Sequence, residues 1–301
     1  MHSPTLRPRG LYDYRAYIAN ESFARSLIEA LRWPDGIRCL RCTSDAIWQM
    51  ADDYRCRSCR YHFSAITGTA LSGSHLTLSQ WIVAIGLFKV GVNGLGLQWA
   101  IGCHYRTALR TLRVLRTAVA TDPLIAKLSG EVEVDEAYVG GRQKGQRGRS
   151  PKGKTIVLGF KQRGDPSSGT RGLAKTTVIP DVTRETLHGK VQEHVVDGST
   201  VYSDGLKSYD GLTELGYQHL PFDHSVQFIQ TDVIHTQGIE GHWGNTKPLM
   251  KARHRKLTHQ NMPGILAETD FRSNHRLDED FISLVLRFLV RSNAVLCPPS
   301  A

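Results

Sequence analysis

The sequence predicts a multidomain α/β protein in which a small zinc-binding module and a helical block precede a domain with a mixed β-sheet. Three observations predict this order. Two Cys-x2-Cys pairs lie near the N-terminus, apolar residues then recur with the period of helices, and the pattern changes to strand-like alternation at residue 131. A chain of 301 residues is long enough for two or three such domains.

Positive charge dominates the composition. Lys and Arg number 38 against 28 Asp and Glu, which leaves a formal net charge of +10. Hydrophobic residues make up 40% of the chain, which excludes wholesale disorder. The longest apolar run, Trp81 to Val92, contains Lys89 and is too short to span a membrane, and we expect no secretory leader. The expected partner is therefore a nucleic acid and not a membrane, and the expected location is the cytoplasm.

A short helix is expected within the N-terminal segment, residues 1–37. Asn20 can cap this helix, and Phe23, Leu27 and Leu31 recur on one of its faces. The turn-forming residues 34–36 then end the helix.

The next segment, residues 38–69, carries four cysteines at the spacing of a zinc ribbon. Cys39-x2-Cys42 and Cys56-x2-Cys59 are separated by 13 residues. Each pair places two thiolates on one tight turn, and two such turns complete a tetrahedral zinc site. Because all four ligand positions are filled, we expect a structural zinc ion that supplies most of the folding free energy of this small segment. Two disulfides or two unrelated turns are the alternatives.

A helix-turn-helix is predicted over residues 75–122. Ser79 can cap a helix that runs to Val90, and helices at Leu95–Ile101 and Tyr105–Ala120 follow after short turns. On the last of these helices one side carries Leu109, Leu112, Leu115 and Val119, and the other carries Arg106, Arg110, Arg113 and Arg116. Such an arginine stripe can bind DNA phosphates or base edges, and a solvated surface helix is the alternative interpretation.

A second basic stretch runs from Arg142 to Lys175 and is rich in glycine. We interpret it either as a solvated loop or as a flexible segment that grips phosphates beside an active site. The residues predicted to contact DNA here are Arg142, Lys144, Arg147 and Arg149.

Residues 129–278 are predicted to form the α/β domain, and residues 279–301 a separate C-terminal helix and tail. The expected strands are Glu131–Val139, Thr155–Phe160, Leu173–Ile179 and Thr200–Ser203, with a helix at Thr183–His194 before the last strand. Further helices are expected at Ile239–Thr246, Gly264–Asn274 and Phe281–Val290.

Three acids in this domain are the candidates for chemistry. Asp135 lies on the first strand, Asp204 follows the fourth strand, and Glu240 enters a helix that carries Lys247 two turns later. Hard oxygen ligands gathered from separate elements can hold two Mg²⁺ ions, or Mn²⁺ in their place, against a phosphodiester. Taken alone, each acid is more often a surface charge, and the prediction depends on their occurrence together.

Several segments resemble one known family. They are Arg32–Gly36, the two cysteine pairs, Val134–Gly141, Tyr202–Gly205, His235–Lys247 and Phe271–Asn274. Over roughly residues 30–276 the sequence resembles the bacterial insertion-sequence transposases of the DDE type that carry an N-terminal zinc ribbon, the ISXO2-like group.

The resemblance implies a ribonuclease-H-like catalytic domain with a mixed sheet and flanking helices. In it, Asp135, Asp204 and Glu240 would bind Mg²⁺ and Lys247 would contact DNA. It also implies binding to terminal inverted repeats, followed by strand cleavage and strand transfer on double-stranded DNA, in association with a bacterial nucleoid. Because two DNA ends must be held together, a homodimer or a larger synaptic assembly is expected.

Departures from the family pattern leave alternatives open. Gln237 stands where the family usually has Asn, Pro248 follows Lys247, and Leu40 replaces a Pro in the first cysteine turn. The main alternative is a DNA-binding derivative without catalysis, such as a repressor, and a host nuclease on the same fold is a third hypothesis. The intact set of acids favours the enzyme.

Overall fold

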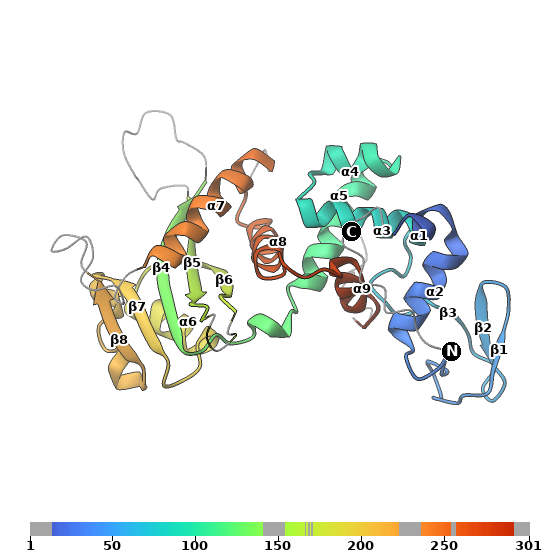
Figure 1. The fold of residues 1–301 in the computed structure, drawn as a ribbon, viewed down its shortest axis with the longest axis horizontal. Coiled ribbons are helices and arrows are strands. Elements are labelled where there is room, and N and C mark those ends of the chain that lie inside the picture. Colours follow the sequence, from blue (N-terminus) through green and yellow to red (C-terminus); the bar gives the residue numbers. More distant parts are fainter. Residues whose placement is uncertain are drawn as a thin grey trace. The chain divides into compact units, whose positions relative to one another are not determined.

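The computed structural model describes residues 14–140, 154–165, 167, 169, 171–222, 236–253 and 257–291. The chain forms two compact units, whose elements are drawn in Figure 1. The first unit consists of Met1–Thr121 together with Leu277–Ala301, and the second consists of Asp122–Arg276.

Two short helices begin the described part of the first unit, α1 (Arg15–Ala19) and α2 (Glu21–Arg32). Asn20 caps α2 as predicted, because its side chain accepts hydrogen bonds from the backbone N–H groups of Ser22 and Phe23. The face that carries Phe23, Leu27 and Leu31 is not the most buried one, because Ala24 and Ile28 are fully buried and Phe23 is 53% exposed. The apolar side of α2 is therefore turned by one residue from the expected row.

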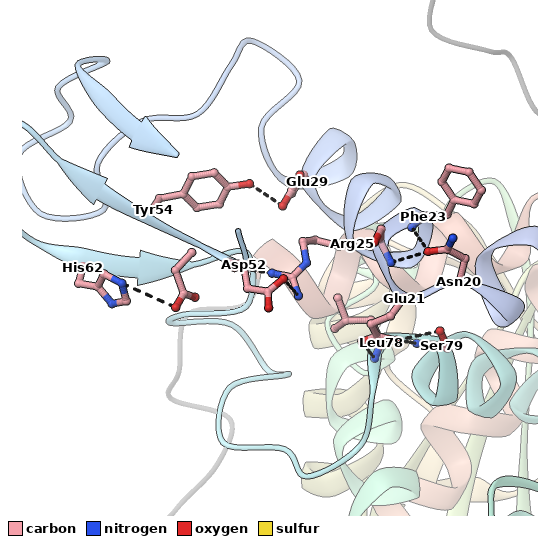
Figure 2. Close-up of polar contacts among 12 residues, drawn as sticks. Asn20, Glu21, Phe23, Arg25, Glu29, Asp52, Tyr54, His62, Leu78 and Ser79 are labelled. Carbon is pink, nitrogen blue, oxygen red and sulfur yellow. Dashed lines mark hydrogen bonds and ion pairs between the residues drawn. The ribbon is translucent and has the colours of Figure 1, made fainter. Parts of the chain in front are cut away.

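The segment with the cysteine pairs forms a small antiparallel sheet in the order β1-β2-β3. Its strands are β1 (Ile47–Gln49), β2 (Asp53–Cys56) and β3 (His62–Ser64). Tyr54 and Phe63 are buried on one face of the sheet, and the ring of Trp33 packs edge-on against both. Figure 2 shows the Tyr54 hydroxyl donating to Glu29 of α2, and a salt bridge from Arg25 of α2 to Asp52.

Three helices follow, α3 (Leu78–Val90), α4 (Gly94–Ile101) and α5 (Tyr105–Val119). Thr77, and not the predicted Ser79, caps α3, because the extended Thr77 forms a reciprocal capping box with Gln80. Ser79 lies in the first turn of α3, where its hydroxyl and its backbone N–H donate to the carboxylate of Glu21 (Figure 2). Glu21 thereby joins α2 to the N-terminus of α3.

Helix α5 buries one face and exposes the other. Leu112 and Leu115 are buried as predicted, whereas Leu109 is 41% exposed and lies against Gly94 of α4. Ala108, four residues before Leu112, completes the buried row in its place. The expectation for Leu109 was therefore wrong by one position around the helix.

The apolar helix α9 (Phe281–Arg291) belongs to the first unit, although it comes from the other end of the chain. The Ser283 hydroxyl is hydrogen-bonded to the hydroxyl of Tyr14, and the backbone N–H of Ala70 donates to the carbonyl of Leu289 at 3.0 Å. α9 thus contributes to a core that is otherwise made by N-terminal residues. Among the helices of the described ranges, none combines the length and the apolar character needed to cross a membrane.

The second unit is built on a mixed sheet in the order β6-β5-β4-β7-β8. β4, β5 and β6 pair antiparallel, whereas β7 and β8 run parallel to β4. The strands are β4 (Glu131–Val139), β5 (Thr155–Gln162), β6 (Ala174–Ile179), β7 (Thr200–Asp204) and β8 (Gln218–Phe222). The predicted mixed α/β architecture is confirmed. β8, an edge strand that contains Pro221, was not predicted.

Helices cover both faces of this sheet (Figure 1). On one face, α6 (Arg184–His194) packs Leu187 and Val191 against the valines of β4. On the other face, α7 (Gln237–Arg253) and α8 (Met262–Asn274) pack around Trp243 and Ile265. α7 is longer than predicted, because it continues through Pro248. The connections include three short 3-10 helices, η2 (Pro123–Ile125), η3 (Lys207–Tyr209) and η4 (Leu212–Leu215).

Polar side chains of α8 cover the β6 edge of the sheet. Asp270 accepts a hydrogen bond from the backbone N–H of Thr176 at 2.7 Å, and the Asn274 amide pairs with both backbone groups of Ala174 at 2.8 Å. These bonds satisfy edge groups that could otherwise pair with another strand. The two ends of the unit also meet, because the buried side chains of His275 and Asp122 are hydrogen-bonded at 2.7 Å.

Candidate zinc and catalytic sites

Among the residues that the structure describes, two groups of side chains could hold a metal ion. The first is the predicted set Cys39, Cys42, Cys56 and Cys59, whose sulfur atoms all lie within 4.8 Å of one another. The Cys39–Cys59 and Cys42–Cys56 sulfur distances are both 3.5 Å, far longer than the ~2.05 Å of a disulfide bond. Four thiolates gathered in this way fit tetrahedral zinc and leave no position open for a substrate.

Backbone geometry prepares the cysteine cluster for a cation. The N–H groups of Arg41 and Cys59 point at the sulfurs of Cys39 and Cys56, each at 3.4 Å. The Cys59 N–H is the main reason why the pKa of Cys56 falls to about 6, so the thiolate form required for binding is favoured. The residue after each pair, Thr43 or Arg60, is left-handed, with φ of 59° and 61°. The two turns are therefore built alike.

The second group consists of Asp135, Glu136 and Asp204, which have carboxylate oxygens within 4.8 Å of one another. The sheet explains why the two aspartates meet. β4 and β7 are parallel and adjacent, and Glu133 pairs with Tyr202. Asp135 and Asp204 each lie two residues beyond this pair, so they reach the same end of neighbouring strands and point to the same face.

Glu136 was not predicted as a site residue. Side chains alternate along a strand, which argued that Glu136 faces away from Asp135. Its carboxylate nevertheless reaches the other two acids, and it is held there by a hydrogen bond from the hydroxyl of the buried Tyr209. Two features could have indicated that Glu136 belongs to the site. They are its position next to Asp135, where β4 passes the end of β7, and Tyr209, which lies shortly after Asp204 in the sequence.

The electrostatics of this group reflect burial and mutual repulsion. Burial, reinforced by the charge of Asp204, raises the pKa of Asp135 to about 6. Burial also raises the pKa of Glu136 to about 7, with Asp204 and Asp135 adding to the shift and the Tyr209 hydrogen bond opposing it. Clustered carboxylates, two of which resist ionisation, are a site where a divalent cation would restore charge balance.

Glu240 and Lys247 face the same region from α7. Both line an open hollow of about 650 Å³ that also contains Asp135 and Glu136. Glu240 lies outside the close group of three acids, and its carboxylate accepts a hydrogen bond from Thr236 at 3.4 Å. The Lys247 ammonium lies 5.3 Å from the ring centroid of Trp243. Lys154, a residue that the sequence analysis did not single out, lines this hollow as well.

Close packing of α7 on the sheet sets the position of these side chains. Gly159 is the β5 partner of Asp135, and a Cβ built on it would lie 2.4 Å from the ring of Trp243. A glycine is therefore required for the indole to rest directly on the strand. Trp243 is buried, and its proximity lowers the pKa of Asp135 against the larger effect of burial.

The predicted DNA-contacting residues are only partly within the described structure. Arg106, Arg110 and Arg113 are exposed along one side of α5, and Arg116 is half-buried. The residues predicted in the second basic stretch, Arg142, Lys144, Arg147 and Arg149, lie outside the described residues. The structure thus describes the surface of the arginine stripe and leaves its role a prediction.

Two family models match the chain. The zinc-ribbon domain of transposases matches residues 19–62, and the ISXO2-like transposase domain matches residues 127–274. An uncharacterized protein in the transposable element ISH50 of Halobacterium salinarum is 27% identical over 235 residues, which cover 73% of this chain and 76% of the relative. An uncharacterized transposase-like protein of Haemophilus influenzae is 28% identical over 120 residues, 40% of this chain and 95% of the relative.

The matched segments coincide with the two groups of metal-binding side chains. The ribbon match contains all four cysteines, and the domain match contains the three clustered acids and both residues of α7. The order of the two domains along the chain is the one expected from the sequence. The chain belongs to the family of ISXO2-like transposases of insertion sequences.

Proposed function

We propose that the protein binds the terminal inverted repeats of an insertion sequence and catalyses metal-dependent DNA strand cleavage and strand transfer. The observation that carries this proposal is the convergence of Asp135, Glu136 and Asp204 at the end of two parallel strands, beside a hollow that contains Lys154 and Lys247. Clustered acids next to free space and cations are what a phosphodiester and its divalent ions require.

The residues present fit Mg²⁺ or Mn²⁺. The donors are carboxylate oxygens, which these hard cations prefer, and burial together with the neighbouring acids raises the pKa values of Asp135 and Glu136, which a bound cation would lower again. Asp135 and Asp204 are the proposed principal ligands, with Glu136 and Glu240 completing the set from either side. When bound, two such ions activate the attacking oxygen and stabilise the leaving oxygen.

Two chemical steps follow from this assignment. In the first, a water oxygen bonds to the scissile phosphorus, the bond from phosphorus to the 3′ oxygen breaks, and the element end retains a 3′-hydroxyl. In the second, that hydroxyl attacks a phosphodiester of the target and loses its proton, while the displaced 3′ oxygen of the target takes one up. Lys247 and Lys154 offset the charge of the phosphates that lie in the hollow. No bond forms between protein and DNA.

The rest of the proposal concerns fold and partners. The sheet order, with three antiparallel strands followed by two parallel ones, supports the ribonuclease-H-like assignment of the second unit. The cysteine cluster supports a structural zinc ion, and the exposed arginines of α5 support a helix-turn-helix that binds double-stranded DNA. A dimer or larger assembly on DNA follows from the need to hold two ends together.

The decisive experiment uses a supercoiled donor plasmid that carries the element's own ends. We expect Asp135→Asn and Asp204→Asn to reduce strand cleavage by at least about 10³-fold while end binding persists, because metal assistance supplies several kcal/mol of transition-state stabilisation. Asp210→Asn, an exposed acid in the loop after Asp204, is the matched control and should cleave like the wild type. Strand transfer by both variants at the wild-type rate would refute the proposal.

The same assay separates the enzyme from a DNA-binding derivative without catalysis. Specific binding of the ends by the wild type, with no nicking in either Mg²⁺ or Mn²⁺, would favour the repressor. α7 continues through Pro248, so this departure from the family pattern does not end the helix.

A further inference from the structure

A buried carboxylate lies directly behind the acid cluster. Glu133, two residues before Asp135 on β4, is only 1% exposed. One of its oxygens accepts a hydrogen bond from the Arg163 Nε at 2.8 Å, and the other accepts one from the backbone N–H of Ile239 at 2.8 Å. It therefore connects the sheet to a helix from inside the protein.

The donor on this helix lies in its N-terminal turn. α7 begins at Gln237, so the N–H of Ile239 is among the first N–H groups, which have no partner within the helix. A carboxylate at this point satisfies the donor and interacts favourably with the helix dipole. The approach is very close, since a Cβ built on Gly238 would lie 2.8 Å from a Glu133 oxygen. Glu240 is the residue that follows Ile239.

Arg163 extends this contact to the third element of the site. Besides Glu133, its guanidinium pairs with Glu131 at 3.2 Å and lies 4.0 Å from the ring centroid of Tyr202. Tyr202 is on β7, where it is the register partner of Glu133 and lies two residues before Asp204. One arginine thus contacts both strands that present the aspartates.

We propose that Glu133 and Arg163 form a positioning pair for the catalytic site. Each contact lies one or two residues from a proposed ligand: Glu133 from Asp135, Tyr202 from Asp204, and Ile239 from Glu240. The pair fixes the start of α7 against β4 and β7, and with it the positions of Glu240 and Lys247 in the hollow that Asp135 also lines. This inference rests on the proposed function, and neither residue touches the reacting atoms.

Net stability is a weaker reason for such a pair. Burying two charges costs desolvation free energy that their attraction barely recovers, so a buried ion pair adds little to stability. A carboxylate that is shared between a guanidinium and a helix N-terminus does fix direction and distance. If the Glu133–Arg163 pair is weakened, we therefore expect the N-terminus of α7 to be displaced while the fold is retained.

Two variants and two controls test this directly. Gly238→Ala adds a methyl group against Glu133, and Glu133→Gln keeps the shape while removing the charge. Gly241→Ala is the matched control on the same helix, because a Cβ there meets nothing within 4 Å. Glu131→Gln is the control for the strand, since Glu131 pairs with the same arginine at 3.2 Å but lies two residues further from Asp135.

The first readout is amide hydrogen exchange in the metal-free protein. In Gly238→Ala and Glu133→Gln, we expect the amides of residues 239–242 to exchange at least about 10-fold faster while those of β5 and β6 keep wild-type rates. The second readout is Mn²⁺ binding by electron paramagnetic resonance, where half-saturation should rise about 10- to 100-fold. Both controls should match the wild type in both measurements.

Wild-type exchange at residues 239–242 together with wild-type Mn²⁺ binding in both variants would overturn the inference. So would uniform acceleration of exchange over the whole second unit, because that is the signature of a purely stabilising pair. If Gly238→Ala fails to fold, Glu133→Gln decides. A wild-type protein that neither binds Mn²⁺ nor cleaves DNA would refute the proposed function instead, and the exchange data would still decide whether the pair positions α7.

Discussion

The two candidate metal centres are built on opposite plans. The ribbon gathers four soft thiolates from two turns within one short segment, and backbone N–H groups already point at the sulfurs. The acid centre takes two neighbouring residues from β4 and one from the end of β7, and Glu240 of α7 lines the hollow beside them. The first closes around its ion, whereas the second leaves a side open for a substrate.

The two centres therefore depend to different degrees on the rest of the fold. The thiolates need little beyond their own turns, and the segment in return needs the metal because its core is small. The carboxylates are held in place by an already folded sheet, where burial and, to a smaller extent, the neighbouring acids raise the pKa values of Asp135 and Glu136. Zinc binding should therefore drive the folding of the ribbon, whereas a divalent cation at the acid centre should stabilise the ionised carboxylates in a domain that is already folded.

The largest effect is expected from removing zinc. Cys56→Ser, or a strong chelator, should unfold the ribbon while the second unit stays folded, because structural zinc contributes on the order of 10 kcal/mol to such small modules. Hydrogen exchange resolved by segment, with zinc counted by elemental analysis, measures this. A Cys103→Ser control, outside the cluster, should keep one zinc ion per chain. If the amides of residues 39–59 were still fully protected from hydrogen exchange in the zinc-free protein, the proposed contrast between the two centres would be wrong.

A smaller effect of opposite sign is expected at the acid centre. A carboxyl whose pKa is higher in the folded state destabilises the fold as pH rises from its unfolded pKa to its folded pKa, here from about 4 to about 6 for Asp135. In EDTA, Asp135→Asn should therefore stabilise the second unit by about 1 kcal/mol at pH 8 and have little effect at pH 4, after a discount for partial exposure. Denaturant titrations at the two pH values measure it.

Comparison of this variant with the wild type also cancels the contribution of His194. Burial lowers the pKa of that histidine to about 4, so His194 makes the fold less stable as pH falls below its unfolded pKa of about 6.5.

Mg²⁺ should raise the melting temperature of the wild-type protein and leave that of Asp135→Asn unchanged. An Asp135→Asn variant that is less stable than the wild type at pH 8 without metal would contradict the raised pKa of Asp135.

The smallest effect concerns the ribbon turns. Arg60 adopts a left-handed conformation, with φ of 61°, that costs an ordinary L residue about 1 kcal/mol and costs glycine almost nothing. Arg60→Gly should therefore raise the chelator concentration needed to unfold the ribbon. Arg57→Gly, at a position without positive φ, should lower it. Equal responses of the two variants would contradict the conformational argument.

Much of this architecture could be predicted because local rules decide it. The strand-like pattern that begins at Glu131 predicted β4 with its observed bounds, Glu131–Val139. The capping side chain of Asn20 predicted where α2 begins. The spacing of the four cysteines was sufficient to predict that their sulfur atoms lie together. In each case the interacting groups are close in sequence, so the pattern contains the answer.

The misses arose where partners come from distant segments. Glu136 joins the acids because Tyr209 holds it, and no periodicity records that contact. β8 was hidden by Pro221, which only an edge position tolerates, and the edge is a property of the whole sheet. Glu133 looked like one more acid of an alternating strand, and only the packing of Gly238 against it shows that it holds a helix.

The contribution of α9 to the first unit has a consequence for synthesis. The second unit is inserted between two parts of the first, and its own ends are fastened together by the bond between Asp122 and His275. A ribosome therefore delivers the complete insert before it delivers the last helix of the unit that began the chain. A message truncated between codons 277 and 281 would yield an intact insert joined to an N-terminal unit that lacks α9, and such a product should be degraded rapidly.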